Sequence, residues 1–326
     1  MLRIFRYIAA IIVLLAAGIF ILNTNLLAPA SAEKPMLIAH RGLGQTFHRE
    51  GLTGETCTAE RIFPPEHDYL ENTIEGFAAA FEAGADMVEF DIHPTTDGHF
   101  VVFHDWTLDC RTDGHGVTRD HSLAELKSLD IGYGYTADNG KSFPFRGKGA
   151  GMMPTLDEVL FAFADKRFLI NIKSDDPEEG KRLAEKLSML PPEHQDFLTV
   201  YGGGAAIDAL HQAMPSLRVL GTDNARKCLV RYALLGWSTI VPESCRNTLF
   251  MIPTNVAPFA WGYPDRLIDR LRQYDTTVVL LGAYDGSGFS SGVDDGQGFA
   301  DVPARFDGAV WTNRIDRIGP LSRSLP

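Results

Sequence analysis

The sequence predicts an α/β fold, specifically a (β/α)8 barrel of the TIM type that forms a single domain. Two observations carry this prediction. Beyond residue 33, short apolar runs alternate with helical patterns and no linker interrupts them, which is typical of a parallel sheet covered by helices. About eight such units fit between residue 33 and residue 326, as a closed barrel requires. An open, doubly wound parallel sheet is the alternative fold.

The first residues of the chain have the pattern of a targeting segment. Arg3 and Arg6 precede Tyr7–Leu22, an almost unbroken apolar run, and an Ala-Ser-Ala sequence at residues 30–32 resembles a signal-peptidase site. The apolar run is long for a signal peptide and slightly short for a membrane span. A cleaved signal and a retained anchor therefore both stay open.

We accordingly expect two parts in the chain. Residues 1–32 are a signal peptide or an N-terminal membrane-targeting helix, which would attach to the membrane through residues 7–27. Residues 33–326 form the barrel domain. Because the positive residues stay inside, this domain is expected outside the cytoplasm, as a periplasmic or secreted protein or as one held at the inner membrane.

Strands are expected where short apolar runs occur. These runs are Met36–Ala39, Met87–Ile92, Phe100–Phe103, Phe168–Ile172, Phe197–Tyr201, Leu217–Leu220, Thr277–Leu281 and Ala309–Trp311. A further strand-like piece near Ser238–Val241 leaves the strand count open. Helical patterns cover Asn72–Ala83, Leu123–Leu129, Leu156–Ala164, Glu178–Leu190 and Arg266–Tyr274.

Two connections, Leu43–Leu70 and Gly132–Gly151, are longer than a compact domain usually contains. Such loops are usually lids or walls of a functional site. The glycine-rich run Asp285–Gly298 is similar, and its glycines do not follow a dinucleotide-binding fingerprint.

Four cysteines, Cys57, Cys110, Cys228 and Cys245, would lie in a compartment that permits oxidation. They allow three complete pairings. The local pairs Cys57–Cys110 and Cys228–Cys245 are the most natural, and the first would staple a long loop beside residue 104. Free, buried cysteines are the alternative.

The overall charge limits the class of partner. The chain has 30 Lys and Arg residues against 42 Asp and Glu residues, a formal net charge of −12. This acidic balance argues against nucleic-acid binding, which needs basic surface to neutralise phosphates. A small anionic substrate held by a few local cations remains compatible with it.

Polar side chains gather where the predicted strands end. Glu89 and Asp91 are two residues apart on one strand, so both carboxylates project from the same face. The other groups at strand ends are His40-Arg41, His104-Asp105 and Asn171 with Lys173. In a barrel the C-terminal ends of the strands build the active site. Carboxylates suit a hard divalent cation, imidazoles suit acid–base catalysis, and Arg with Lys suits an anionic oxygen. This combination predicts metal-assisted phosphoryl chemistry.

Five short motifs occur in the order found in a known enzyme family. They are His40-Arg41-Gly42, Glu71-Asn72-Thr73, Glu89-Phe90-Asp91, Phe103-His104-Asp105 and Asn171-Ile172-Lys173. The chain thereby resembles the glycerophosphodiester phosphodiesterase family, a group of phospholipase C-like TIM barrels with H-R-G, E-N-T, E-x-D, F-H-D and E-x-K motifs. The closing WTNRID is similar to that family's T-D-R-P-D. The resemblance covers about residues 36–316 and is dense before residue 175.

The resemblance implies a hydrolase that binds Ca²⁺ or Mg²⁺ and cleaves glycerophosphodiesters to glycerol phosphate and an alcohol. The glycerol hydroxyl next to the phosphate is the nucleophile that it implies. Carried over by motif, the roles are His40 and His104 as the acid–base pair, Arg41 and Lys173 on the phosphate, and Glu89 and Asp91 on the metal.

Two departures from the family pattern affect these expectations. Asn171 stands where the family has a third metal-binding carboxylate. Its amide oxygen can ligate Ca²⁺ or Mg²⁺ but lacks the negative charge, so we expect weaker metal binding or a carboxylate supplied from elsewhere. Leu70 replaces the proline that usually precedes E-N-T, and the loop before it is longer than usual. This second departure leaves the substrate's alcohol open.

Several residues have competing interpretations. Glu71 either caps a helix or supports the site, and Asp105 either orients a neighbour or reacts. Glu89 and Asp91 could instead form buried salt bridges with Arg41 and Lys173. The loop histidines are expected to be solvated polar residues near the site's mouth; they are His48, His67, His93, His115 and His121.

Two alternative functions remain beside the diesterase. A phospholipase D-like enzyme acting on lysophospholipids or sphingolipids would gain from a membrane anchor, whereas the mixed, fairly polar loop before residue 70 favours water-soluble diesters. A barrel that binds phosphodiesters without turnover is the other alternative, and Asn171 is its sequence support.

Overall fold

The computed structural model describes residues 2–28, 33–53, 56–286 and 291–325. Parallel strands form a nearly closed barrel whose hydrogen-bonded order is β6-β5-β4-β2-β1-β9-β8-β7. These eight strands are β1 (Met36–His40), β2 (Met87–Pro94), β4 (Arg167–Ile172), β5 (Leu198–Gly202), β6 (Arg218–Gly221), β7 (Leu249–Pro253), β8 (Thr277–Leu281) and β9 (Ala309–Thr312). At the gap between the two end strands, Thr248, the residue before β7, donates from Oγ1 to the carbonyl of Val219 on β6 at 2.6 Å. The predicted TIM-type fold is confirmed.

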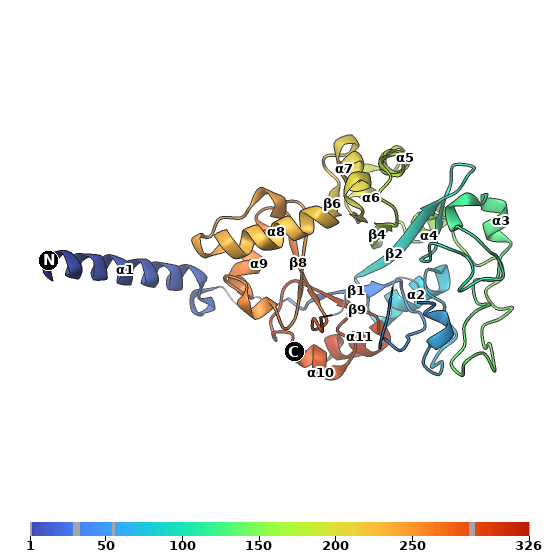
Figure 1. Cartoon of the computed structure of the whole chain (residues 1–326), viewed down its shortest axis with the longest axis horizontal. Coiled ribbons are helices and arrows are strands. Elements are labelled where there is room, and N and C mark those ends of the chain that lie inside the picture. Colours follow the sequence, from blue (N-terminus) through green and yellow to red (C-terminus); the bar gives the residue numbers. More distant parts are fainter. Residues whose placement is uncertain (1, 29–32, 54–55, 287–290, 326) are drawn as a thin grey trace.

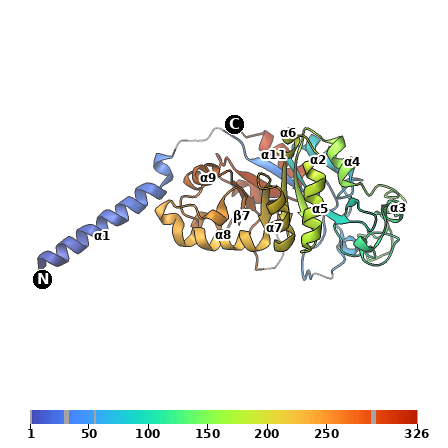
Figure 2. The same ribbon diagram turned by 90° about the horizontal axis from the view of Figure 1, so that it is seen from above.

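Helices cover the outside of this sheet. The helices are α1 (Leu2–Asn23), α2 (Ile74–Ala83), α3 (Leu123–Lys127), α4 (Leu156–Ala162), α5 (Pro177–Ser188), α6 (Pro192–Gln195), α7 (Gly204–Ala213), α8 (Thr222–Leu235), α9 (Asp265–Arg272), α10 (Gly296–Ala300) and α11 (Ile315–Arg323). Figure 2 shows α8, α7 and α5 following one another along one side of the barrel. The helix α1 projects from one end of the molecule, and the segment around α3 lies at the other end (Figure 1).

The strand predicted at Phe100–Phe103 is present but is not a barrel strand, and one barrel strand was not predicted. The run Phe100–Phe103 contains β3 (Phe100–Val102), which pairs antiparallel with β2 and is not a barrel strand. The barrel strand β7 was missed, and the piece at Ser238–Val241 is not a strand. Both pieces are short apolar runs, and periodicity alone cannot decide which of two such neighbours pairs with the sheet.

The barrel interior is a packed layer of apolar side chains, as expected for eight tilted strands. Its buried members come from seven of the strands and are Ile38, Met87, Leu169, Leu220, Leu249, Val279, Ala309 and Trp311. The remaining barrel strand, β5, contributes the partly buried Tyr201. A larger core lies between the sheet and its covering helices.

The two long connections pack on each other rather than standing apart. Ala59, Ile62 and Leu70 from one connection share a small core with Leu126, Tyr135 and Phe145 from the region after β3. The disulfide Cys57–Cys110, with a Cα–Cα distance of 5.4 Å, joins the same two segments. The second disulfide is Cys228–Cys245, at 4.9 Å. Both predicted pairings are confirmed, and the segments form a lobe beside the strand ends.

Candidate active site

The parallel register brings the motif residues to one level of the barrel. His40, the last residue of β1, lies opposite Glu89 on β2, and Asp91 lies opposite Asn171 on β4. Lys173 follows the end of β4. The side chains of Glu89 and Asp91 are 0% and 1% exposed. Two carboxylates are therefore held out of water at the C-terminal end of the sheet, where burial must be offset by partners.

Glu89 is held by a residue that sequence analysis missed. The hydroxyl of Tyr201 on β5 donates to Glu89 Oε1 at 2.5 Å, and the backbone N–H of Arg41 donates to Oε2 at 3.1 Å. Burial, reinforced by the negative charge of Asp91, raises the pKa of Glu89 to about 8. The sequence feature that could have identified Tyr201 is its position at the end of the predicted strand Phe197–Tyr201, but no motif marks it.

Asp91 lies at the centre of the polar cluster. Its oxygens accept hydrogen bonds from Asn72 Nδ2 at 3.1 Å and Asn171 Nδ2 at 2.8 Å. They also lie 3.4 Å from both Lys173 Nζ and Arg41 Nε. Burial alone would raise the pKa of Asp91, but Lys173, followed by His104 and Arg41, outweighs it and holds that pKa well below its usual range.

His40 is oriented by two successive hydrogen bonds that start from Asp294, far from it in the sequence. Its Nδ1 lies 2.6 Å from Asn313 Oδ1, and Asn313 Nδ2 donates to Asp294 Oδ2 at 2.8 Å. Because the amide nitrogen of Asn313 is committed to Asp294, its oxygen faces His40, so Nδ1 of His40 carries the proton. Nε2 is then an acceptor, and Arg41 Nε donates to it at 3.2 Å. Burial, with the charge of Arg41, lowers the pKa of His40 to about 3.

His104 has a different partner. Its Nδ1 lies 2.6 Å from Asp105 Oδ1, and the other oxygen of Asp105 lies 2.9 Å from Arg111 Nε. Burial and the charge of Arg41 lower the pKa of His104, while Asp91 and Asp105 oppose that shift. Burial would raise the pKa of Asp105, but Arg111 and His104 bring it well below its usual value. Asp105 thus orients a neighbour, and Arg111 is a second residue that sequence analysis missed.

The antiparallel strand β3 explains how His104 reaches this cluster. After β2 extends to Pro94 the chain turns back, and Ile92 pairs with Val102. The backbone N–H of Phe103 donates to the carbonyl of Asp91 at 3.0 Å. His104 therefore follows a returning hairpin strand, not the C-terminal end of a barrel strand as predicted.

Glu71 supports the site and does not cap the helix. It is 8% exposed, accepts from Arg41 Nη1 at 2.9 Å and lies 3.5 Å from Arg111 Nη1. The cap of α2 is Thr73, whose side chain accepts from the backbone N–H of Gly76. Glu71 thereby forms ion pairs with both Arg41, which lies beside His40, and Arg111, which lies beside Asp105.

His93 departs from the expected solvated loop residue. It lies on β2, two residues beyond Asp91, and is 1% exposed. Its Nε2 is 3.4 Å from the carbonyl of His104. Burial lowers its pKa to about 4, which favours a neutral ring next to the His104 carbonyl. The prediction was wrong because β2 is two residues longer than its apolar run.

The donor set fits a hard divalent cation. Among the described residues, no group of three or more His, Cys, Asp and Glu side chains is placed to hold a metal. Glu89 and Asp91 nevertheless supply buried carboxylate oxygens, and a half-turn of the Asn171 amide would present its oxygen beside Asp91. Oxygen donors suit Ca²⁺ or Mg²⁺, and a cation beside Glu89 and Asp91 would offset the burial and the mutual repulsion that raise the pKa of Glu89.

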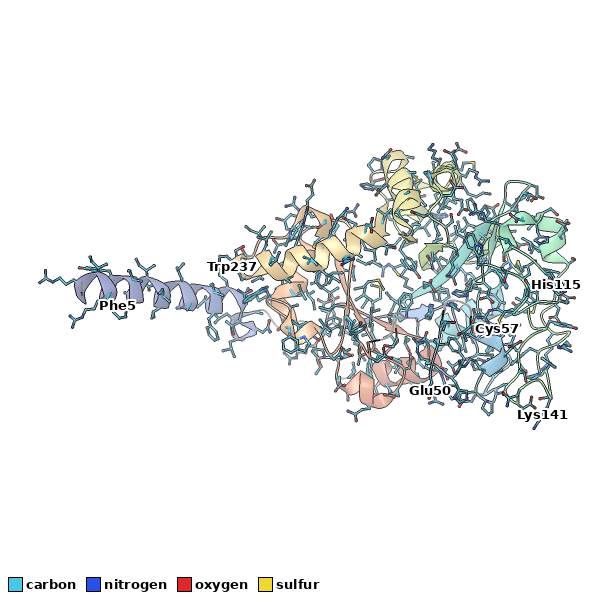
Figure 3. All side chains as sticks on the ribbon, viewed as in Figure 1. Phe5, Glu50, Cys57, His115, Lys141 and Trp237 are labelled. Carbon is cyan, nitrogen blue, oxygen red and sulfur yellow. A yellow bond between two sulfur atoms is a disulfide. The ribbon has the colours of Figure 1, made fainter. Side chains whose placement is uncertain are left out.

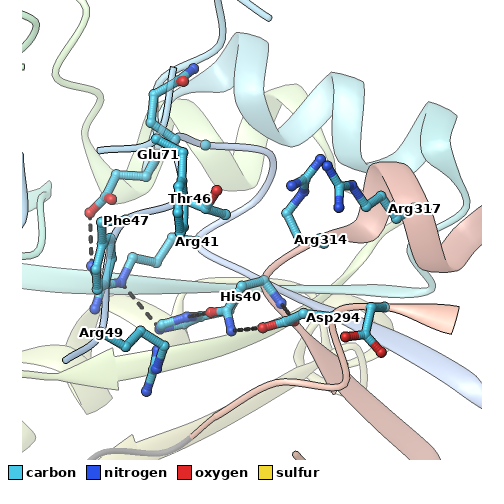
Figure 4. Close-up of a pocket in the computed structure, with 14 residues that line it drawn as sticks. His40, Arg41, Thr46, Phe47, Arg49, Glu71, Asp294, Arg314 and Arg317 are labelled. Carbon is cyan, nitrogen blue, oxygen red and sulfur yellow. Dashed lines mark hydrogen bonds and ion pairs between the residues drawn. The ribbon is translucent and has the colours of Figure 1, made fainter. Parts of the chain in front are cut away.

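A cavity of about 240 Å³ opens beside His40 and Arg41. Phe47 and Phe63 of the long first connection line one side, and Asn313 and Arg314 line another. Figure 4 shows Arg41 hydrogen-bonded to both His40 and Glu71 on one side of the cavity. Arg314 and Arg317 lie on another side. The connection before residue 70 thus lines the cavity next to His40 and Arg41, where a wall of the site was predicted.

Comparison with known proteins connects this geometry to one group. Residues 40–192 match the glycerophosphoryl diester phosphodiesterase family. The chain is 45% identical over 104 residues to a glycerophosphodiester phosphodiesterase of Caldanaerobacter subterraneus, covering 32% of this chain and 39% of the relative. It is 32% identical over 175 residues to the Bacillus subtilis glycerophosphodiester phosphodiesterase, covering 52% and 49%. The chain thus spans less than half the length of these curated relatives.

Solved structures share the fold over a larger part of the chain. A glycerophosphoryl diester phosphodiesterase domain from Mycobacterium tuberculosis superposes with a TM-score of 0.63 at 18% identity, covering 89% of this chain and 99% of that one. A phosphodiesterase of Oleispira antarctica, solved with its product sn-glycerol-3-phosphate, gives 0.55 at 19% identity, covering 89% and 98%. At these identities the structures establish a common barrel.

Proposed function

We propose that the chain is a member of the glycerophosphoryl diester phosphodiesterase family, which residues 40–192 match, and that it is a phosphoric diester hydrolase. Its proposed reaction cleaves a glycerophosphodiester to glycerol phosphate and an alcohol. The observation that carries this proposal is the pair of imidazoles, each oriented through Nδ1 by its own partner, beside Arg41 and Lys173. This arrangement supports proton transfer next to a bound phosphate.

His40 is the proposed base of the first step. Its Nδ1 proton is committed to Asn313 and its Nε2 lone pair faces Arg41 and Glu89. A neutral imidazole of this kind accepts the proton from the glycerol hydroxyl next to the phosphate as that oxygen attacks phosphorus. The nucleophile therefore comes from the substrate, which gives a cyclic glycerol phosphate.

His104 is the proposed acid of the same step. Its carboxylate partner Asp105 stabilises an imidazolium, whereas the amide partner of His40 adds no charge. The negative phosphate of the substrate favours the protonated form of His104 further. As the bond from phosphorus to the leaving oxygen breaks, His104 gives its proton to that oxygen and the alcohol departs.

The second step reverses these roles. Water attacks the cyclic phosphate and gives a proton to His104, while His40 returns its proton to the glycerol oxygen as the ring opens. Both histidines recover their starting states and one water molecule is consumed. Arg41 and Lys173 offset the charge on the phosphate oxygens throughout.

Metal dependence is part of this proposal. Glu89, Asp91 and the amide oxygen of Asn171 would hold Ca²⁺ or Mg²⁺, which would supply positive charge to a phosphate oxygen. Since these ligands carry two negative charges in place of three, weak affinity for the cation is expected.

The location of the enzyme is also proposed. In the part of the chain that the structure describes, one helix is long and apolar enough to cross a membrane, at Arg3–Asn23. This helix supports the proposal that the barrel lies outside the cytoplasm and is attached to the membrane through α1. The cleavage-site sequence at residues 30–32 lies outside the described residues.

The deciding experiment measures release of glycerol phosphate and free alcohol by the full chain in detergent. Glycerophosphocholine, glycerophosphoethanolamine, a lysophospholipid and a lysosphingolipid are compared with Ca²⁺, with Mg²⁺ and with chelator. Chelator-sensitive turnover of a water-soluble diester is the expected result, and preference for a lysolipid would point to the phospholipase D-like alternative. A folded protein that binds these diesters without hydrolysing any of them would contradict the proposal.

A further inference from the structure

The end of α1 is built into the barrel domain by a buried arginine. Arg270 of α9 is 8% exposed. Its Nη2 donates to the carbonyl of Leu22 at 2.6 Å and its Nη1 donates to Asn23 Oδ1 at 3.0 Å. The last carbonyls of a helix lack partners within the helix, and their negative dipole favours a cation. Arg270 therefore caps the C-terminus of α1 from the domain side.

A second group of hydrogen bonds continues this junction. Arg266 donates from its backbone N–H to Asn25 Oδ1 at 3.3 Å and from Nη2 to the carbonyl of Leu27 at 2.8 Å. Asn25 Nδ2 donates to the carbonyl of Tyr263 at 2.5 Å. Asn23 Nδ2 donates to the carbonyl of Trp237 at 3.0 Å. Together with those of Arg270, these hydrogen bonds hold the C-terminal end of α1 in one orientation on the domain.

The apolar stretch of α1 before this junction is not buried by any other described part of the chain. The segment Arg3–Asn23 contains 21 residues, and its most apolar 18-residue stretch has a mean hydropathy of 2.5 and is not buried. At ~1.5 Å per residue it is about 30 Å long, which matches the hydrocarbon thickness of a bilayer.

Apolar side chains surround the place where α1 meets the domain. Leu234 is 67% exposed, Leu235 41%, Trp237 42% and Ile240 55%. They lie at the C-terminal end of α8 and directly after it. Figure 3 shows Trp237 at the end of α8 that adjoins α1. We call these four residues the α8-end surface.

The charges on α8 are ordered relative to this surface. Arg226, Lys227 and Arg231 are exposed on the same helix, about one to two turns before Leu234. Basic residues thus stand farther from α1 than the apolar ones, although the whole chain is acidic. Tryptophan at the interface and basic residues at the phosphate level are the order that a lipid surface favours.

We propose that the α8-end surface rests on the bilayer from which α1 emerges. The occupant is the leaflet on the domain side, because this surface is continuous with the membrane-length helix and the junction fixes their relative orientation. The lobe containing Cys57 and His115 lies at the far end of the molecule, away from α1 (Figure 3). The inference rests on the proposed attachment through α1 but not on the catalytic mechanism.

Tryptophan quenching in vesicles tests the proposal. The full chain is reconstituted into phosphatidylethanolamine and phosphatidylglycerol vesicles with or without brominated acyl chains, and Trp237→Phe is compared with Trp106→Phe. Trp106 is a matched control because it is 46% exposed and its carbonyl accepts from the backbone N–H of Thr118, close in sequence to His115 at the end of the molecule away from α1. We expect Trp237→Phe to remove the largest share of bromolipid quenching and Trp106→Phe to leave it unchanged.

Two outcomes of this experiment would overturn the inference. If Trp237→Phe removes no more quenching than Trp106→Phe while the protein floats with the vesicles, the barrel stands clear of the bilayer. If the full chain does not float with vesicles, α1 is not an anchor and the surface has another partner. Diester hydrolysis measured on the same samples reports the proposed activity separately from both results.

Discussion

Asn313 Oδ1 lies 2.6 Å from His40 Nδ1, and this contact joins the last strand of the barrel to the first. It decides which imidazole nitrogen faces Arg41. Asp294 decides the direction of the Asn313 amide, since it accepts from both the side chain and the backbone N–H of that residue. The tautomer of the proposed base therefore depends on residues that lie outside its own motif.

Asn313→Ala is expected to lower kcat by about 10²-fold, the usual size of one positioned acid–base contribution. KM should change little, because Asn313 acts through His40. Asn313→Asp keeps an acceptor for Nδ1 and should restore part of kcat. Its carboxylate would also raise the pKa of His40, so the neutral base forms only at higher pH and the acidic limb of the pH–kcat profile moves upward. Equal loss in both variants with an unmoved pH profile would show that Asn313 is merely structural.

His104→Ala is expected to reduce turnover by about 10²-fold or more while the fold is retained. His115→Ala is the matched control, since His115 is 86% exposed and contacts Asp109 rather than the site. Steady-state hydrolysis and thermal unfolding of both variants check this expectation. If His104→Ala keeps full activity, the acid–base assignment fails.

Asn171→Glu should tighten binding of Ca²⁺ or Mg²⁺ by about tenfold or more, because it adds the negative charge that the site lacks. Calorimetric titration of each cation into the wild type and the variant measures the change. Asn139→Glu, on an exposed turn, is the control for charge alone. Unchanged affinity would mean that Asn171 does not face the cation.

Arg111→Met is expected to reduce the free energy of unfolding by about 3 kcal/mol, because it leaves the buried Asp105 and Glu71 carboxylates with less compensation. Arg146→Met, at an exposed cation–π contact with Tyr133, should change it by less than ~0.5 kcal/mol. Urea denaturation measures both values. Equal effects would show that Arg111 has no special role in holding the His104 partner.

Sequence alone determined the barrel class, most of its strands and the motif residues at their ends. This was possible because alternation of apolar runs and the placing of polar residues directly after them are local properties of the chain. His40, Glu89, Asp91 and Asn171 lie at or near the strand ends that this pattern predicted, and the parallel pairing of β1, β2 and β4 brings them together.

Tertiary structure decided how those residues are oriented and charged. Tyr201 reaches Glu89 across 112 residues and Asn313 reaches His40 across 273. Arg111 becomes the partner of Asp105 only when the hairpin β2–β3 returns the chain beside Asp91. Each of these contacts depends on which strands become neighbours and in which direction β3 runs. No local pattern encodes that information, because it arises when distant segments pack around a common core.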